Sequence, residues 1–174
     1  LLHRIFMIIR GAFRDSSTQS PLDLSDAILH QAAALSGPSD PLLPQPILEL
    51  ILSQHREQLD QRDYFGKLPL HHAVQVRKAL SPASTKSASE WVTWVRNILE
   101  RAPHAYAAPD GQGRLPLHCA LDFTGEDCPL LLQDARAEVV RDLATSFPKS
   151  VETRDPVLGL YPFMQAAACP GVPL

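Results

Sequence analysis

The sequence has few cysteines, and none of them is spaced as a metal or redox pair. Three of its 174 residues are cysteine, and no two of these are separated by two residues. An odd number without a Cys-x-x-Cys motif argues against a disulfide framework and is typical of a reducing compartment. We therefore expect an intracellular protein, cytoplasmic or nuclear, in which Cys119, Cys128 and Cys169 are small buried apolar residues.

An excess of charge of one sign and a long apolar run are also missing. The formal net charge is -3, so there is no general attraction to nucleic acid or to an anionic membrane. The most apolar stretch, residues 1–13, contains Arg4 and Arg10 and is shorter than the roughly 20 apolar residues of a bilayer span. Its helical periodicity predicts that residues 1–22 form an N-terminal packing helix and loop, with an amphipathic membrane anchor as the alternative. We predict no nucleic-acid partner and no membrane insertion.

Sequence motifs of nucleotide-binding and hydrolytic sites are absent as well. The chain has no Gly-x-Gly-x-x-Gly after a strand, no Gly-x-x-x-x-Gly-Lys-Ser/Thr, no His-Glu-x-x-His and no Gly-x-Ser-x-Gly. The acidic residues Asp122, Glu126 and Asp127 are typical of a solvated loop rather than of a cation site. These absences predict a protein that is not an enzyme and that needs no cofactor or metal.

Proline, by contrast, is abundant, and part of it belongs to an internal repeat. The stretch "GKLPLHHA" at 66–73 returns as "GRLPLHCA" at 113–120 and, more weakly, as "GLYPFMQA" at 159–166. The three glycines are 47 (113 − 66) and 46 (159 − 113) residues apart. A partial earlier copy, "AILHQAAA", begins at Ala27. Such regular spacing indicates a repeat architecture.

Each copy carries the signals of a tight turn followed by a short helix. An aspartate precedes the first glycine by three or four residues, and this pair favours a turn in which glycine takes a positive φ. A proline then stands at the predicted first helical position, where its missing N–H is not needed. The aspartates are Asp63, Asp110 and Asp155, and the prolines are Pro69, Pro116 and Pro162.

A second, longer helix is predicted in each unit from a single apolar stripe. Apolar residues recur at helical spacing, three or four residues apart, in the segments 47–52, 91–99 and 132–147, and Trp91 and Trp94 fall on the stripe as core residues. The polar stretch "SPASTKSASE" at 81–90 predicts an exposed loop between the two helices. One stripe needs a neighbour to cover it, so we predict an all-α fold of stacked helix-turn-helix units.

The Asp-x-x-Gly turn followed by Gly-x-x-Pro-Leu-His-x-Ala resembles the ankyrin repeat, and the array is similar to divergent, long-repeat ankyrin-like arrays of diatoms and other algae. The resemblance implies an ankyrin-like repeat stack, or solenoid, over residues 23–174, with about three to four repeats, the last incomplete, and long inter-helix loops. The family's threonine before proline is replaced by Leu68, Leu115 and Tyr161, which removes a hydroxyl N-cap worth about 1 kcal/mol. The implied repeat-signature residues are Gly66, Pro69, His71, Gly113, Pro116, His118, Gly159 and Pro162.

The histidines allow two interpretations. His71, His72, His118 and Cys119 together would suit a metal-dependent hydrolase if the repeats brought them together. However, adjacent helical residues point about 100° apart, and the second copy has Cys119 where the first has His72. The resemblance instead implies that His71 and His118 join neighbouring turns by hydrogen bonds. We expect His72 and Cys119 to face the open side of the stack.

The ankyrin resemblance implies a non-catalytic scaffold or adaptor that binds a protein partner through the turn tips and the exposed face of each first helix. The alternatives are a targeting or regulatory fragment of a larger multidomain enzyme and the metal-dependent hydrolase. Neither the partner's identity nor the oligomeric state follows from the sequence. The candidate contact residues are Tyr64, Phe65, Lys67, His72, Gln75, Gln112, Arg114, Asp122, Val157 and Leu158.

Overall fold

The computed structural model describes residues 27–36, 43–75, 85–122 and 130–168, and the regular structure within these ranges is entirely helical. The predicted all-α class is therefore confirmed for the described residues, while the predicted N-terminal helix within 1–22 lies outside them. No helix in these ranges is long and apolar enough to cross a membrane. In chain order the helices are α2 (Ile28–Leu35), α3 (Gln45–Gln54), η1 (Arg56–Asp60), α4 (Pro69–Val74), α5 (Thr85–Arg101), η2 (Pro103–Ala107), α6 (Pro116–Leu121), α7 (Leu130–Ser146), η3 (Pro148–Glu152) and α8 (Pro162–Ala168).

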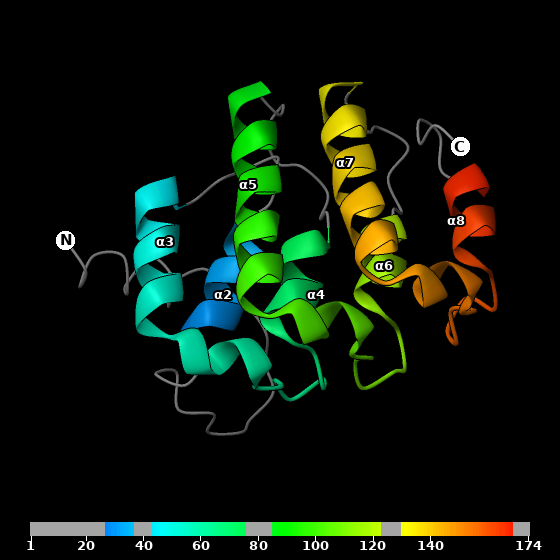
Figure 1. Ribbon diagram of the computed structural model, residues 1–174, viewed down its shortest axis with the longest axis horizontal. Coiled ribbons are helices and arrows are strands. Elements are labelled where there is room, and N and C mark those ends of the chain that lie inside the picture. Colours follow the sequence, from blue (N-terminus) through cyan, green and yellow to red (C-terminus); the bar gives the residue numbers. More distant parts are fainter. Residues whose placement is uncertain (1–26, 37–42, 76–84, 123–129, 169–174) are drawn as a thin grey trace, which may run out of the picture.

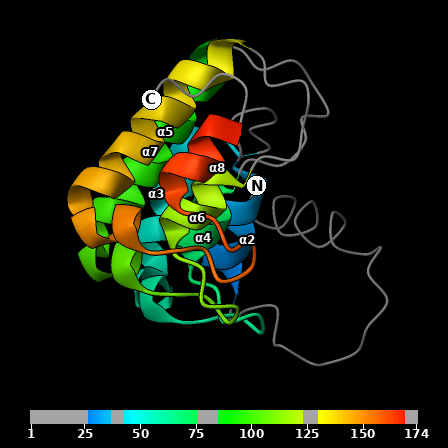
Figure 2. The same ribbon diagram turned by 90° about the vertical axis from the view of Figure 1, so that its right-hand side faces the viewer.

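The α-helices form two rows. Helices α2, α4, α6 and α8 pack one on the next as an inner row, and α3, α5 and α7 pack one on the next as an outer row. Each of α2, α4 and α6 also packs on the longer helix that follows it. Figure 1 shows the outer row as three neighbouring helices, and Figure 2 shows the two rows nearly end-on. Helix α8 is the last helix of the inner row among the described residues.

The outer helices are held by the apolar stripes. In α5, the side chains of Trp91, Trp94 and Val95 are at most 2% exposed, which confirms the prediction that both tryptophans belong to the core. Full burial of a large apolar side chain stabilises a fold by about 1.5–3 kcal/mol. The indole Nε1 of Trp91 also donates to the carbonyl oxygen of Ala73 at the end of α4 (2.7 Å), so the helix pair is joined by a polar contact as well.

The loop predicted at 81–90 is shorter than expected, since α5 already begins at Thr85. Ala88, which is 4% exposed, lies three residues before Trp91 and extends the buried stripe by one turn. The prediction of an exposed loop is therefore wrong for residues 85–90. Their composition is mostly polar, and Ala88 alone was too weak a signal of the helix.

Short 3₁₀ helices after each outer helix were not predicted. Helices η1, η2 and η3 follow α3, α5 and α7 and lead the chain from the outer row back to the next turn. Pro103 and Pro148 stand at the first position of η2 and η3. For η2 and η3, a proline shortly after the helical stripe was the available signal, because proline ends the preceding helix and begins the next.

Candidate interaction surface: the turns and the inner helices

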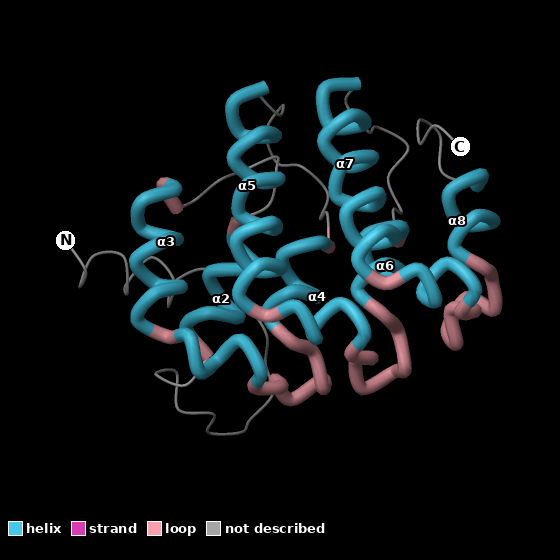
Figure 3. The backbone as a smooth tube through the Cα atoms, viewed as in Figure 1, coloured by secondary structure: helices cyan, strands magenta, loops and turns pink. Residues whose placement is uncertain are grey.

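The three turns before α4, α6 and α8 are each built on an aspartate, with one residue more in the third, and they lie along one edge of the helix rows (Figure 3). In each, the aspartate Oδ1 atom accepts two backbone N–H groups of the turn, at distances of 2.8 to 3.3 Å. The glycines have φ values of 69°, 80° and 68°, in the left-handed region. The predicted roles are thus confirmed for Asp63, Asp110 and Asp155 and for Gly66, Gly113 and Gly159.

The first two turns touch each other. The N–H of Gly111 donates to the carbonyl oxygen of Phe65 at 3.0 Å. The Arg62 side chain donates to the carbonyl oxygen of Gly66 at 2.7 Å and also to that of Pro109, so it bridges the same two turns. Contacts of this kind hold the turn tips in fixed positions relative to each other.

The turn tips expose apolar side chains. Tyr64 is 77% exposed and Phe65 is 68% exposed, and their rings pack edge-to-face against each other with centroids 5.6 Å apart. Val157 and Leu158 in the third turn are about half exposed, and Gln112 in the second turn is exposed. We refer to these five residues as the tip row. The structure therefore places these predicted contact residues at the surface.

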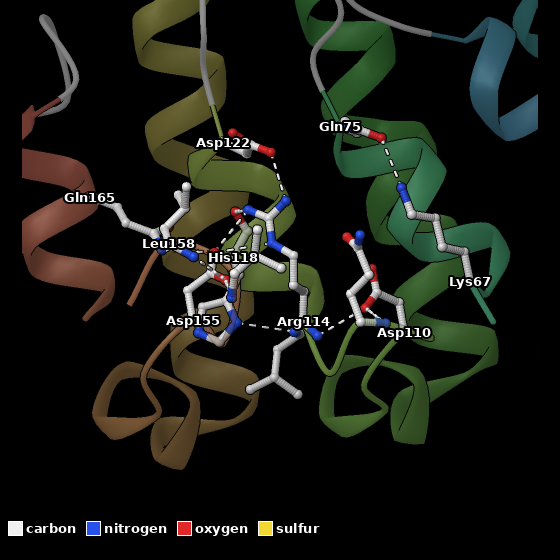
Figure 4. A network of polar contacts seen from close by, with 12 residues as sticks. Lys67, Gln75, Asp110, Arg114, His118, Asp122, Asp155, Leu158 and Gln165 are labelled. Carbon is white, nitrogen blue, oxygen red and sulfur yellow. Dashed lines mark hydrogen bonds and ion pairs between the residues drawn. The ribbon is translucent and has the colours of Figure 1, made fainter. Parts of the chain in front are cut away.

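Arg114 does not belong to the exposed tips, which corrects the prediction that placed it there. The residue is 7% exposed. Its Nε and Nη2 atoms bind Asp155 Oδ2 at 3.0 and 2.9 Å, and its Nη1 atom binds Asp122 Oδ2 at 2.7 Å (Figure 4). The sequence suggested exposure because arginine in a turn is normally solvated, whereas here the next repeat supplies a buried carboxylate. Asp122 is consequently engaged by Arg114 within its own repeat.

The carboxylate of Asp155 is the centre of this contact. It is fully buried, and the Nε2 atom of Gln165 donates to its Oδ2 atom at 2.9 Å. Burial disfavours its ionised form, but the N–H of Val157 and the Arg114 guanidinium more than offset this and hold the pKa of Asp155 below its usual value. Asp155 therefore joins the second and third turns as a buried anion.

The preceding repeat has a weaker version of the same arrangement. Lys67 occupies the position of Arg114, and its Nζ atom donates to Gln75 Oε1 over 3.4 Å. Both side chains are half-buried. Asp110, which corresponds to Asp155, is 6% exposed, and its Oδ2 atom has no hydrogen-bond partner in the described part of the chain. Lys67 and Gln75 thus lie at the surface of the inner row, next to a buried carboxylate that lacks a strong pair.

The signature histidines cap the inner helices. His71 and His118 are the third residues of α4 and α6, and each Nδ1 atom accepts the backbone N–H of the residue before the proline at 3.1 Å. This is the reciprocal half of a capping box. The other half, a side-chain acceptor at Leu68 or Leu115 for the first backbone N–H groups of the helix, is absent. His30 occupies the same third position in α2, as the partial repeat at residue 27 predicts.

Two of these histidines also reach the next turn. The Nε2 atom of His118 donates to the Thr153 carbonyl oxygen at 2.9 Å, and that of His30 lies 3.0 Å from the Gln61 carbonyl oxygen. Thr153 and Gln61 are the residues that follow η3 and η1. The Nε2 atom of His71 is buried without a hydrogen bond among the described residues. The contact between turns that the resemblance implied is present for His118, whereas the His71 ring only approaches the backbone of Arg114 in the next turn without a well-formed hydrogen bond.

The fourth position of the inner helices faces the turn rather than the open side, which corrects the prediction for His72 and Cys119. The Nε2 atom of His72 bonds to Asp63 Oδ2 at 2.8 Å, and its side chain is 13% exposed. Cys119 is 1% exposed, and burial raises the pKa of its thiol to about 11. Gln165 occupies this position in α8 and binds Asp155. These residues stabilise their own repeat.

The metal-site interpretation has no cluster to support it in the described ranges. No three His, Cys, Asp or Glu side chains of these ranges come together as a group that would hold a metal ion. His72 and His118 are instead engaged by hydrogen bonds to the turns. Glu126, Asp127 and Cys128 lie outside the described residues.

Acidification is expected to destabilise the fold through the buried histidines. Burial lowers the pKa of His71 from 6.5 to about 4, although the nearby Asp110 carboxylate favours the charged form. The unfolded chain therefore binds more protons between these pH values, so stability decreases as the pH falls from about 6.5 toward 4. At pH 5 the free energy of unfolding is expected to be about 2 kcal/mol lower because of His71 alone. Burial also lowers the pKa values of His30 and His72, so their protonation destabilises the fold in the same pH range.

Urea unfolding at pH 7.5 and at pH 5 measures this loss. His71→Gln keeps an oxygen acceptor for the Leu68 N–H but does not titrate, so its stability should depend less on pH than that of the unchanged protein. The same pH dependence in both proteins would show that His71 is not responsible.

Comparisons with known proteins do not identify a family or a function for this chain. Comparison of the sequence with protein-family models, with curated proteins and with solved structures gives no significant match. A functional interpretation therefore depends on the contacts that recur within the chain: the aspartate turn three times, the histidine cap twice and the two rows of packed helices.

Proposed function

We propose that the chain is a divergent, long-repeat ankyrin-like solenoid. Its repeats are α2 with α3, α4 with α5, and α6 with α7, followed by α8 as the start of a fourth. The proposal is supported by the packing of inner on inner and outer on outer helices, and by the recurring turn. It is also supported by the proline at the first position and the histidine at the third position of α4 and α6. Stacked units of this kind bury a continuous core and leave one extended edge free.

The proposed function is a non-catalytic protein-interaction module that binds a protein partner through the tip row. The observation that carries this proposal is the exposed pair Tyr64 and Phe65, held on a turn whose backbone is fixed by Asp63 and by the contact of Phe65 with Gly111. Aromatic side chains are enriched at the energetic centres of interfaces. Because the turn is already ordered, binding loses little conformational entropy. Val157 and Leu158 extend the same edge.

The polar groups of the inner helices support a scaffold rather than a catalytic role. His72 is bound to Asp63, His118 to Thr153, and Arg114 to Asp155. The Cys119 thiol is buried, and its pKa of about 11 keeps it protonated near neutral pH. The alternative, a targeting or regulatory fragment of a multidomain enzyme, uses the same tip row. It differs only in that the surface contacts a catalytic domain of the same polypeptide.

Removal of the aromatic tip should abolish partner binding and leave stability unchanged. In Tyr64→Ser with Phe65→Ser, no buried contact is lost, because both side chains are more than two-thirds exposed. We expect at least a tenfold decrease in captured partner, measured by quantitative mass spectrometry after affinity capture, and a melting temperature within about 2 °C of the unchanged protein.

Leu50→Ser is the matched control. Leu50 is 42% exposed on α3 in the outer row, so this change removes surface apolar area away from the tips. It should leave capture unaffected. Equal capture by all three proteins would show that the tip row is not the contact surface, and equal loss in the control would show that the effect is not specific to the tips.

A further inference from the structure

The first turn is joined to α2 and α4 through two histidines. The Nε2 atom of His72 in α4 donates to Asp63 Oδ2 at 2.8 Å. The Nε2 atom of His30 in α2 lies 3.0 Å and 3.2 Å from two carbonyl oxygens that flank the turn, those of Gln61 and Lys67. Helices α2 and α4 pack on each other (Figure 1), and the two imidazole rings meet edge-to-face with centroids 6.0 Å apart. We refer to His30 and His72 as the histidine pair.

A proton taken up by either ring of the histidine pair binds at Nδ1. Carboxylate and carbonyl oxygens only accept hydrogen bonds, so the Nε2 atom of each ring already carries a hydrogen in the neutral form. Both Nδ1 atoms are buried, and neither has a hydrogen-bond partner in the described part of the chain. Protonation therefore creates a buried N–H group without an acceptor, and this is unfavourable while the turn keeps its observed position.

A single carboxylate, that of Asp63, acts on both rings. Burial alone would raise its pKa, but hydrogen bonds from His72 and from the turn hold the pKa of Asp63 below its usual value, so it is ionised. It can balance one imidazolium but not two, and Lys67, which also acts on His72, is itself a cation. Burial outweighs the attraction to Asp63 and lowers the pKa values of both His30 and His72 below 6.5.

The other elements packed against α4 are η1, α5 and α6. The charged side chains of η1 are exposed, and so are those of α5 after the half-buried Glu90. In α6, His118 is bound to the carbonyl oxygen of Thr153, and Cys119 is a buried neutral thiol. Asp63 is thus the carboxylate bonded to the histidine pair within the described ranges.

The third turn is fastened in the same way but without a titratable donor. Gln165 occupies the position of His72, and its Nε2 atom donates to Asp155 Oδ2 at 2.9 Å. In the second turn Cys119 occupies this position, and Asp110 Oδ2 has no partner among the described residues. Of these three turns, only the first is fastened by histidine, and it is the turn that carries the aromatic tip.

We propose that the histidine pair makes the first turn acid-sensitive: protonation of His30 and His72 releases the turn from α2 and α4 and frees the aromatic tip from its fixed position. The consequence for binding rests on the proposed function of the tip row, whereas the opening of the turn does not. A tip that is no longer anchored loses the preorganisation that favours binding.

The direction of the effect follows from the two states of the turn. When the turn is open, both rings reach water and titrate with a pKa near 6.5. When it is closed, burial lowers the pKa values of His30 and His72. The open form therefore binds more protons, and its population increases as the pH falls below about 6.5.

Hydrogen exchange of individual amides, followed by NMR, measures the opening of the turn without any partner. Asp63 Oδ1 accepts the N–H groups of Phe65 and Lys67, whose protection factors should decrease by about tenfold or more between pH 7.5 and pH 5. The N–H of Val157, held by Asp155 Oδ1 in the third turn, is the internal reference and should change by less than about twofold. An equal decrease in both turns would report unfolding of the whole chain and would overturn the proposal.

His72→Gln gives the first turn the fastening of the third, since Gln165 shows that a glutamine at this position reaches the turn aspartate. This variant should keep the protection at pH 7.5 and reduce the decrease at pH 5 by about threefold or more, and adding His30→Gln should remove the rest. His104→Gln is the matched control, because it removes a histidine that is also bound to an aspartate, Asp60, but in an exposed pair. The control should retain the full pH dependence.

Circular dichroism at both pH values checks that each variant keeps its helix content, and the single variants decide the question if the double variant does not fold. A pH dependence that is unchanged in both His72→Gln and His30→Gln would show that the histidine pair does not control the turn. Loss of the pH dependence in His104→Gln would contradict the proposal as well.

Partner capture at the two pH values separates this proposal from the proposed function. Capture by the unchanged protein should decrease at pH 5, and His72→Gln with His30→Gln should restore it. If capture at pH 7.5 does not depend on Tyr64 and Phe65, the proposed function is wrong, while amide exchange still decides whether the turn opens. If capture depends on these two residues but is equal at both pH values, the tip row binds a partner and its control by the histidine pair is refuted.

Discussion

Replacing Arg114 with alanine is expected to lower the free energy of unfolding by about 3 kcal/mol. The guanidinium is the main cation for Asp155, whose carboxylate is fully buried and which Arg114 contacts through Nε and Nη2. Removing one partner of a buried ion pair leaves an uncompensated charge away from water, and this typically costs 3–5 kcal/mol. Gln165 still donates to the same carboxylate, which places the expected loss at the lower end of that range.

The preceding repeat provides the control within the same molecule. Lys67→Ala removes the cation at the corresponding position, but Lys67 is half-buried and makes one long hydrogen bond of 3.4 Å to Gln75. Lys67→Ala should therefore lower the free energy of unfolding by less than about 1 kcal/mol, as is usual for charge contacts near the surface. Urea unfolding of both variants at pH 7.5 measures the difference. Similar losses for the two would mean that the burial of Asp155 is not the source of the effect.

The turns and inner helices could be predicted because their signals are local. An aspartate three residues before a glycine forms the observed turn through its own Oδ1 atom, and the glycine takes positive φ, as at Asp63 and Gly66. A proline at the first helical position, such as Pro69, needs no partner beyond the next few residues. Repetition of these signals at 47 and 46 residues then predicted helical units that stack.

The burial and the hydrogen-bond partners of individual polar side chains could not be predicted, because they depend on contacts with other parts of the fold. Arg114 and Lys67 occupy equivalent positions, yet only Arg114 is enclosed, by an aspartate 41 residues later in the chain. His72 was expected at the open face, although the geometry of the helix start turns the fourth residue toward the Oδ2 atom of Asp63. The exposure of Tyr64 and Phe65 also depends on where the next turn lies, which their own sequence does not determine.

Replacing Gly66 with alanine is the second change that we expect to destabilise the protein strongly, because the first turn contacts the second at this residue. A Cβ atom at this position would lie 2.7 Å from the Gly111 nitrogen and 2.8 Å from its Cα, both backbone atoms that cannot move aside cheaply. The φ of +69° adds about 1–2 kcal/mol of strain for an L side chain. Displacement of Gly111 also weakens its hydrogen bond to Phe65, worth about 1 kcal/mol. Gly66→Ala should therefore destabilise the protein by about 3 kcal/mol.

Gly159→Ala separates the two causes of this loss. Gly159 has nearly the same φ, +68°, but a Cβ atom there would meet no atom within 4 Å. Its replacement should cost only the backbone strain, about 1 kcal/mol. The difference between the two variants, measured by urea unfolding at one pH, thus reports the contact of the first turn with the second. Equal losses at Gly66 and Gly159 would show that the turns do not touch in solution. In that case Tyr64 and Phe65 would lose the support that makes their turn a preordered binding surface.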